Sequence, residues 1–219
     1  MANVFAAASF YANDMAILAP SVKGLQKLLN LCTTFCSDWD ICLKVKKTKN
    51  MWFGKKQVVE AKTIVNGDTI EWVHEWKYLG VMLRSGRRFC CSVKDRVKQF
   101  YRSLNSILRV EGRSDDMILL RLLEAHCVPV LTYAMEMTHV ADRDARRSLR
   151  VAYNAIFRKL FGYKYCESVT NLQHYLGRST WEEIVDSRYN GFMNRAKLCP
   201  PESVVHVICS MFIPLIPFM

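Results

Sequence analysis

Phe10-Tyr11-Ala12-Asn13-Asp14-Met15 is the stretch on which the interpretation of the whole sequence depends. It lies between two short apolar runs, 4–8 and 15–18, which have the length of β-strands. Asn13-Asp14 falls where the chain would reverse direction, and both residue types tolerate the positive φ of a tight turn. The stretch therefore predicts a β-hairpin with a carboxylate at its tip. An ordinary β-turn explains the same residues fully, so a function needs support from elsewhere in the chain.

The next part of the sequence, up to residue 86, predicts one helix and further strands. Ser21 is positioned to cap a helix in which apolar residues recur at spacings of three and four up to residue 36. Asn66-Gly67 separates two strand-like runs and predicts a hairpin whose second strand reaches residue 73. Residues 76–83 are predicted to form one further strand.

Beyond Gly86 the apolar period changes to the 3.6 residues of a helix. Helices are predicted for residues 92–111, 114–129, 143–161, 168–177 and 180–197. Ser92, Ser114 and the capping box at Thr180 provide N-terminal caps, and Pro129 should kink or end the second helix. The predicted fold class is α+β: antiparallel hairpins with one helix, followed by an all-helical bundle.

The net charge of +11 is spread unevenly over the 219 residues. Residues 1–83 contain 10 basic and 7 acidic side chains, and residues 165–219 contain 4 and 5. The middle of the chain, 84–164, contains 17 basic and 8 acidic side chains. A basic surplus confined to the middle third indicates a surface that faces a polyanion.

Five segments together resemble the reverse transcriptases of the non-LTR (LINE-type) retrotransposons. Tyr-Ala-Asn-Asp-Met at 11–15 is similar to the Tyr-Ala-Asp-Asp box of that family, except that Asn13 stands where the family has its first aspartate. The other segments follow in order as Val45-Lys46-Lys47-Thr48-Lys49, Trp76-Lys77-Tyr78-Leu79-Gly80-Val81, Pro129-Val130-Leu131-Thr132-Tyr133 and Tyr153-Asn154-Ala155-Ile156-Phe157-Arg158-Lys159-Leu160-Phe161. The resemblance extends from about residue 10 to residue 197.

The resemblance implies a partial palm in residues 1–86, a helical thumb in 87–165, a helical extension in 166–199 and an apolar tail in 200–219. It also implies that Asn13, Asp14 and Lys47 are catalytic positions, that Asp14 is a metal ligand and that Mg²⁺ is the ion. Two divalent cations need several carboxylates, and the family's upstream aspartate would precede Met1. We therefore expect weak Mg²⁺ binding and no polymerase activity from this chain alone.

The same resemblance implies that Tyr78, Leu79 and Gly80 belong to a primer-binding hairpin. Glycine there would let a nucleic-acid backbone approach closely, although a bulge or turn would need Gly80 equally. The lysines at 44–56, which surround an apolar Met-Trp-Phe run, have two interpretations of equal weight. They suit a strand edge protected by solvated lysines, and Lys47 suits a contact with the incoming nucleotide.

Two predicted helices carry basic stripes beside their apolar faces. Such a stripe is often only a solvated face, but arginine supplies 13 of the 17 basic residues between 84 and 164, and its planar fork suits phosphate. We therefore expect RNA and DNA, as template and primer, to be bound by Arg87, Arg88, Lys94, Lys98, Arg102, Arg147 and Arg150.

Other classes of site lack support in the sequence. The nine cysteines have no second cluster at zinc-site spacing, so we expect free thiols in a reducing compartment. No signal peptide precedes the first strand. The apolar tail, 203–219, contains Pro214 and Pro217, which argue against a membrane anchor. A nuclear or cytoplasmic location is expected.

The sequence is thus interpreted as the C-terminal part of a non-LTR retrotransposon reverse transcriptase, with the missing N-terminal part of the polymerase as a partner. One alternative is a non-enzymatic nucleic-acid-binding or assembly module that reuses the helical part. Another is a decayed reading frame without a selected function. Both alternatives retain the basic helices, so the sequence alone does not separate them.

Overall fold

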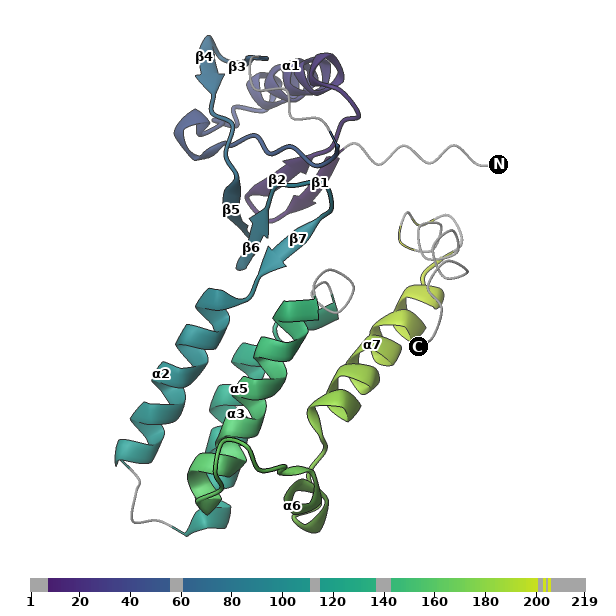
Figure 1. The fold of residues 1–219 in the computed structure, drawn as a ribbon. Helices are drawn as coiled ribbons and strands as arrows, with labels where there is room; N and C mark the ends of the chain where they lie inside the picture. The colour runs from purple at the N-terminus through teal and green to yellow at the C-terminus, as the bar shows by residue number, and fades with distance from the viewer. Residues whose placement is uncertain are drawn as a thin grey trace. The chain divides into compact units, whose positions relative to one another are not determined.

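The computed structural model describes residues 8–55, 61–110, 115–136, 143–200, 203 and 205. The chain divides into two compact units, the first made of residues 1–89 and 199–219 and the second of residues 90–198. The described part contains small antiparallel sheets and α-helices (Figure 1), which agrees with the predicted α+β class.

The first unit combines three antiparallel hairpins with one long helix. In chain order its elements are β1 (Ala8–Tyr11), β2 (Asp14–Ile17), α1 (Val22–Asp38), the short 3-10 helix η1 (Val45–Lys47), β3 (Thr63–Val65), β4 (Asp68–Ile70), β5 (Glu75–Tyr78) and β6 (Val81–Arg84). Ser21 caps α1 as predicted, because its side-chain oxygen accepts a hydrogen bond from Gly24 N.

The first hairpin forms as predicted, but its turn lies one residue earlier. Tyr11 pairs with Asp14, so Ala12-Asn13 makes the two-residue turn and Asp14 begins β2. Ala12 has a φ of 49°, and it takes the left-handed conformation that the sequence pattern assigned to asparagine or aspartate. The pairing register overrides the local preference of these side chains.

The second hairpin has the predicted Asn66-Gly67 turn, with φ values of 52° and 85°. Its second strand ends at Ile70 and does not continue to residue 73. The chain leaves the hairpin there to make a parallel bridge between Asn50 and Trp72. Asn50 is buried, and its Nδ2 donates to Thr63 Oγ1 at 2.6 Å. The backbone of Asn50 pairs with the segment after Ile70, since Asn50 N donates to Glu71 O and Val73 N donates to Asn50 O, at 2.9 Å each.

Residues 76–83 form two strands, which contradicts the single strand predicted for them. β5 and β6 pair as a tight hairpin in which Tyr78 lies opposite Val81. The turn residues Leu79 and Gly80 have φ values of 46° and 77°. Leucine gives no turn signal and Gly80 suits a bulge or a turn equally, so the residue pattern did not locate the reversal. The family resemblance did imply a hairpin at Tyr78-Leu79-Gly80.

The core of the first unit is small. Leu29, Val65 and Ile70 are buried together where α1 packs on the β3–β4 hairpin (Figure 1). Gln26 adds a polar connection, because its side-chain amide both donates to Ile64 O and accepts from Ile64 N, at 2.8 Å each. Gln26 of α1 thus pairs with the backbone of β3 in the way that a neighbouring strand would.

The second unit begins with β7 (Cys90–Ser92) and is otherwise helical. Its helices are α2 (Lys94–Val110), α3 (Asp116–Thr132), α5 (Arg143–Phe161), α6 (Thr170–Tyr175) and α7 (Trp181–Lys197). Asp115 caps α3 by accepting from Met117 N and Ile118 N, so the predicted cap at Ser114 is wrong. Pro129 lies inside α3 and does not end it.

A continuous apolar core holds the second unit together. α2, α3 and α5 pack against one another, and α7 packs on α5. Phe100, Leu104, Leu120, Leu123 and Phe157 are completely buried in this core. The capping box at Thr180 forms as predicted, with Glu183 N donating to Thr180 Oγ1 and Thr180 N donating to Glu183 Oε2.

Within the described residues, no helix is both long enough and apolar enough to cross a bilayer. Most of the apolar tail, 206–219, lies outside the described residues, and so does its predicted role. The described cysteines are free thiols.

Candidate nucleic-acid interface

The predicted catalytic positions lie on the surface of the first unit. Asn13 and Asp14 are exposed at the tip of the β1–β2 hairpin. Lys47 is exposed at the end of η1, and no hydrogen bond or ion pair between described residues joins it to the hairpin. The described residues contain no group of three or more His, Cys, Asp or Glu side chains that could hold a metal ion. A single exposed carboxylate does not fit the ligand set of a Mg²⁺ pair, so no reaction step is assigned here.

The predicted primer-binding residues form the turn of the β5–β6 hairpin. Tyr78 and Leu79 are half-buried, and Gly80 is exposed. Leu79 has a left-handed backbone, which is unfavourable for a side chain other than glycine, asparagine or aspartate. Arg87 and Arg88, also in the first unit, are exposed beyond this hairpin. Gly80, Arg87 and Arg88 are therefore accessible to a ligand. The left-handed backbone of Leu79 is a local strain that the surrounding structure maintains.

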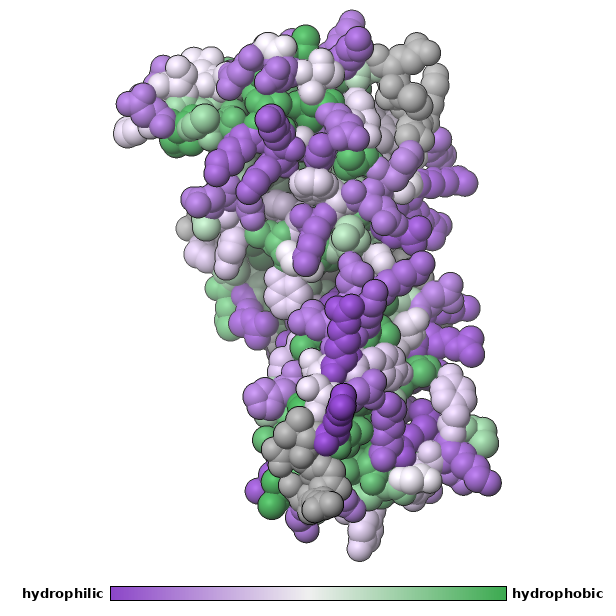
Figure 2. Space-filling view, turned by 90° about the vertical axis from the view of Figure 1, so that its left-hand side faces the viewer, coloured by the Kyte–Doolittle hydropathy of each residue, from purple (hydrophilic) through white to green (hydrophobic). Residues whose placement is uncertain are grey.

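The predicted cations of α2 form one exposed stripe. Lys94, Lys98, Arg102 and Arg109 recur at spacings of four and seven, which places them within an arc of about 80°. All four side chains are exposed, and none makes an ion pair or side-chain hydrogen bond with another described residue. Figure 2 views the side on which α2 lies in Figure 1, and strongly hydrophilic side chains gather there over the helical unit. We call these four residues the α2 stripe.

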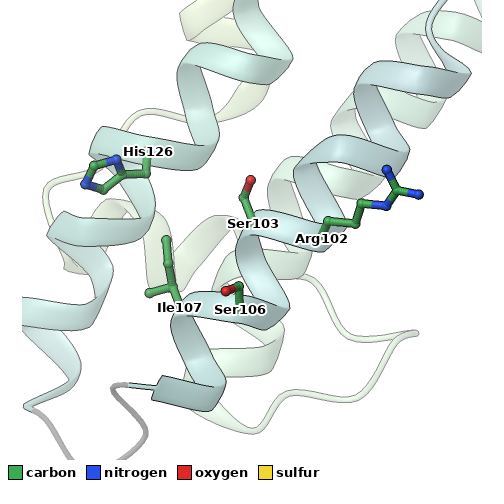
Figure 3. A pocket seen from close by; sticks show the side chains of 5 residues that line it. All are labelled: Arg102, Ser103, Ser106, Ile107 and His126. Carbon is green, nitrogen blue, oxygen red and sulfur yellow. The ribbon is translucent and has the colours of Figure 1, made fainter.

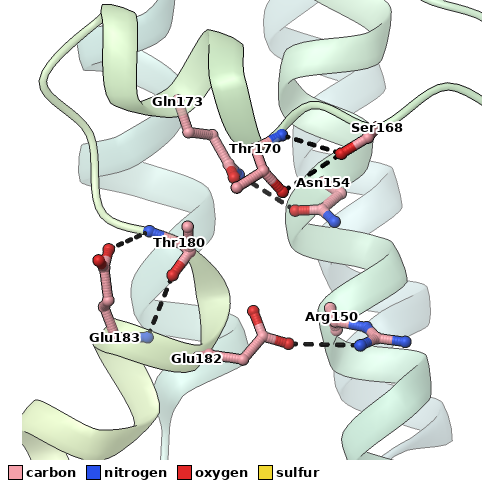
Figure 4. A network of polar contacts seen from close by, with 8 residues as sticks. All are labelled: Arg150, Asn154, Ser168, Thr170, Gln173, Thr180, Glu182 and Glu183. Atoms are coloured by element: carbon pink, nitrogen blue, oxygen red, sulfur yellow. Dashed lines mark hydrogen bonds and ion pairs between the residues drawn. The ribbon is translucent and has the colours of Figure 1, made fainter.

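The arginines of α5 point toward a different set of partners. Arg150 Nη1 lies 3.4 Å from Glu182 Oε1 of α7, and Asn154, one turn further along, accepts from Gln173 Nε2 of α6 at 3.1 Å (Figure 4). Arg147 is exposed and shares this side of α5 by its helical spacing. Arg147 and Arg150 therefore lie on the side of α5 that faces the α6–α7 segment, and they do not extend the α2 stripe.

Lys159 is the α5 cation that reaches α2, and the sequence analysis did not select it. Its Nζ donates to Asn105 Oδ1 at 2.6 Å and lies 6.0 Å from the ring centre of Tyr101. Asn105 lies within the arc of the α2 stripe. Lys159 immediately follows Arg158, but successive helical residues point about 100° apart, so Lys159 is not in line with the arginines of α5. Only the packing of α5 on α2 shows that Lys159 lies beside the α2 stripe.

Arg96 is an arginine of α2 that has a structural role. It is buried, and its Nη1 donates to Tyr133 O and, at 3.4 Å, to Leu131 O at the C-terminal end of α3. A cation is favourable there because the last carbonyls of a helix lack intrahelical donors. Burial lowers the pKa of the Arg96 guanidinium. Its position at the edge of the apolar arc, about 40° from Phe100, is a sequence signal that could have identified this role.

An open groove between α2 and α3 borders the α2 stripe. It is lined by Arg102, Ser103, Ser106, Ile107 and His126. In Figure 3 the Arg102 guanidinium and the His126 ring point in different directions, and the two serine hydroxyls lie between them. The polar groups do not converge on one reacting atom. The groove can therefore supply hydrogen-bond donors beside the stripe, but it does not resemble a catalytic site.

Comparison with known proteins gives a distant relationship. No family model matches the chain, and no solved structure matches it. An alignment of 161 residues is 24% identical to the RNA-directed DNA polymerase from the mobile element jockey of Drosophila funebris. It covers 69% of this chain but only 18% of that polymerase, so the chain spans less than a fifth of its relative. The similarity supports the relationship to mobile-element reverse transcriptases that the motifs predict.

Proposed function

We propose that this chain is a portion of an RNA-directed DNA polymerase of a mobile element, and that its helical unit binds RNA and DNA through the α2 stripe. The observation that carries the proposal is the lack of acidic partners for four aligned cations, Lys94, Lys98, Arg102 and Arg109, among the described residues. The distant similarity to a mobile-element polymerase supports nucleic acid as the polyanion.

The physical basis of binding is the release of counterions from the phosphate backbone. Lys94, Lys98 and Arg102 are separated by one helical turn each, or about 6 Å along the axis of α2. Because these side chains make no hydrogen bond or ion pair with another described residue, they give up no such interaction when they bind phosphate. Backbone contacts of this kind carry no base information, so binding should be independent of sequence.

The first unit corresponds, in this proposal, to the end of a polymerase palm and the second unit to a thumb. The hairpin that carries Asn13 and Asp14 would then be what remains of the metal site. With one carboxylate at that position, the chain would not incorporate nucleotides without the rest of the polymerase.

The rest of the polymerase is the partner that the hairpin would need. Among the described residues, β1 pairs only with β2 in a two-stranded sheet, and Phe10 and Tyr11 are 66% and 67% exposed. An isolated two-stranded hairpin has little stability in water, and an unpaired edge strand favours addition of another strand. Further strands of a palm would cover both features.

Binding is tested by titrating the full chain with an RNA–DNA hybrid at several salt concentrations. The logarithm of the affinity should fall steeply with the logarithm of the salt concentration, and Lys98→Ala with Arg102→Ala should reduce that slope by up to about two. The matched control is Lys23→Ala with Lys27→Ala, an exposed pair of α1 with the same spacing. Equal slopes for the two double variants would contradict a specific role of the α2 stripe.

Activity is tested by primer extension on a primed RNA template with Mn²⁺. We expect no extension by the wild type or by Asn13→Asp, because Asn13→Asp restores one carboxylate but not the full set of metal ligands. Asp14→Ala is the reference for background. Extension by the wild type that is lost in Asp14→Ala would show that the hairpin is an active site.

A further inference from the structure

Two aromatic side chains and two cations gather where α2, α5 and the segment after α5 meet. The Arg158 guanidinium lies 5.6 Å from the ring centre of Tyr165, and Lys159 Nζ lies 6.0 Å from that of Tyr101. Burial raises the pKa of the Tyr101 phenol, and the nearby Tyr165 acts in the same direction. The two pairs are therefore neighbours, and we call Tyr101, Arg158, Lys159 and Tyr165 the aromatic–cation cluster.

The segment that carries Tyr165 is held in place by hydrogen bonds. Arg158 donates from Nε and Nη2 to Glu167 O, at 3.2 and 3.0 Å. Glu167 N in turn donates to Lys164 O at 3.1 Å, and Tyr163 N donates to Arg158 O at 3.0 Å. Glu167, which accepts the hydrogen bonds from Arg158, belongs to the same turn as Tyr165. The guanidinium and the Tyr165 ring are therefore held in a fixed position relative to each other.

Tyr165 is nevertheless 78% exposed, although it is an aromatic side chain. Arg158 occupies one face of its ring, which leaves the other face available to a ligand. Such a ring loses little conformational freedom on binding, because the cation beneath it already orients it. The exposed face is the feature that the α2 stripe does not explain.

We propose that Tyr165 is a stacking platform for an unpaired base of a single-stranded nucleic acid whose phosphates lie on Lys159 and the adjacent α2 stripe. The inference rests on the proposed nucleic-acid binding and adds the kind of strand. Asn105 holds Lys159 beside the stripe, and Lys98 is three residues from Tyr101 on the same helix. Lys159 and Lys98 therefore lie beside Tyr101, within the same cluster as Tyr165, and these cations are where the phosphates of a strand stacked on Tyr165 would bind.

A single strand fits this arrangement better than a duplex does. Stacking on a side chain requires a base whose face is uncovered, and the bases inside a duplex already stack on their neighbours. Stacking is also tolerant of sequence, because every base has a π-face. This agrees with a binding surface that contacts the backbone without reading the bases.

The test compares two single strands of about 12 nucleotides, an oligothymidylate and an abasic strand with the same phosphates. Tyr165→Ala in the full chain should weaken oligothymidylate binding by about 5- to 100-fold and leave binding of the abasic strand unchanged. Tyr165→Phe should bind both strands as the wild type does, because it keeps the ring. The control, Tyr175→Ala, removes a tyrosine of α6 that is 88% exposed, and it should change the binding of neither strand.

The salt dependence separates this inference from the proposed function. Tyr165→Ala should keep the wild-type salt slope, because no phosphate contact is lost. Wild-type affinity of Tyr165→Ala for oligothymidylate, or an equal loss on both strands, would overturn the stacking site while the salt-dependent binding stands. Failure of the wild type to bind either strand at low salt, while it binds the RNA–DNA hybrid, would overturn the single-strand inference alone. Failure to bind the hybrid as well would overturn both proposals.

Discussion

The two units bury their apolar side chains to different extents. In the second unit, helices on several sides of α3 and α5 enclose Leu120, Leu123 and Phe157 completely. In the first unit, the main cluster is built on Leu29, Val65 and Ile70, beneath a single helix. Both units also expose large apolar side chains. Those more than half exposed are Phe10, Tyr11, Leu18, Leu31, Phe35, Trp39 and Ile41 in the first unit, and Ile118, Tyr133, Tyr165, Tyr175 and Leu198 in the second.

This difference follows from the number of faces that each unit can cover. A helix or a hairpin has one apolar side, and it is stable only when another element covers that side. The second unit has enough helices to cover α3, the most apolar of them. The first unit has short hairpins, and α1 packs against only part of them. We infer that the second unit is the more independent folding unit.

The largest expected effect concerns resistance to proteolysis. Limited proteolysis of the full chain should leave a protected fragment close to residues 90–198, because cleavage requires local opening and the continuous core opposes it. Peptide mapping by mass spectrometry identifies the fragment. A protected fragment within residues 1–89 would show instead that the first unit is the more independent folding unit.

The next effect is the loss of a buried ring from the core of the second unit. Phe157→Ala should lower the free energy of unfolding of this unit by about 3–5 kcal/mol. Hydrogen exchange followed by mass spectrometry would show faster exchange throughout residues 90–198. Phe10→Ala is the control, and because Phe10 is exposed it should change stability by no more than about 0.5 kcal/mol. A similar loss in both variants would remove the difference between the units.

A smaller effect is expected for the buried guanidinium at the end of α3. Arg96→Ala should destabilise the second unit by about 2–3 kcal/mol, because Leu131 O and Tyr133 O lose a charged donor. Arg102→Ala, on the same helix but exposed, should be nearly neutral for stability and should affect only nucleic-acid binding. Chemical denaturation of the two variants measures the difference. Equal stabilities would show that Arg96 acts like a surface cation.

The mildest effect is a loss of stability at alkaline pH. Burial raises the pKa of both Tyr101 and Tyr153, and Tyr153 Oη donates to Ser179 O at 2.7 Å. The phenol of Tyr153 ionises near pH 10 in the unfolded chain, whereas in the folded chain it stays neutral at that pH. Its contribution to stability is therefore fully present below pH 10 and falls above it, by up to about 1.4 kcal/mol per pH unit, and Tyr101, which is only half-buried, acts in the same direction. Tyr153→Phe should reduce this fall. A stability independent of pH between 9 and 11, measured by denaturation, would contradict it.

Local sequence signals located most of the elements of both units. Ser21, Asn66-Gly67 and the capping box at Thr180 mark a helix start, a turn and a second helix start where the structure has them. Two of the errors arose where a neighbouring residue could satisfy the same need. Asp115 caps α3 in place of Ser114, and Ala12 adopts the left-handed conformation in place of Asn13 or Asp14.

The sequence by itself determined the α+β class, the basic stripe of α2 and the relationship to mobile-element polymerases. These properties depend on periodicity and on motifs that lie within a few residues of one another. Only the tertiary structure decided which cations remain available: Arg150 meets Glu182, Arg96 meets the end of α3, and Lys159 meets Asn105. Each of these partners is more than 30 residues away along the chain, so helix packing brings them together and periodicity cannot.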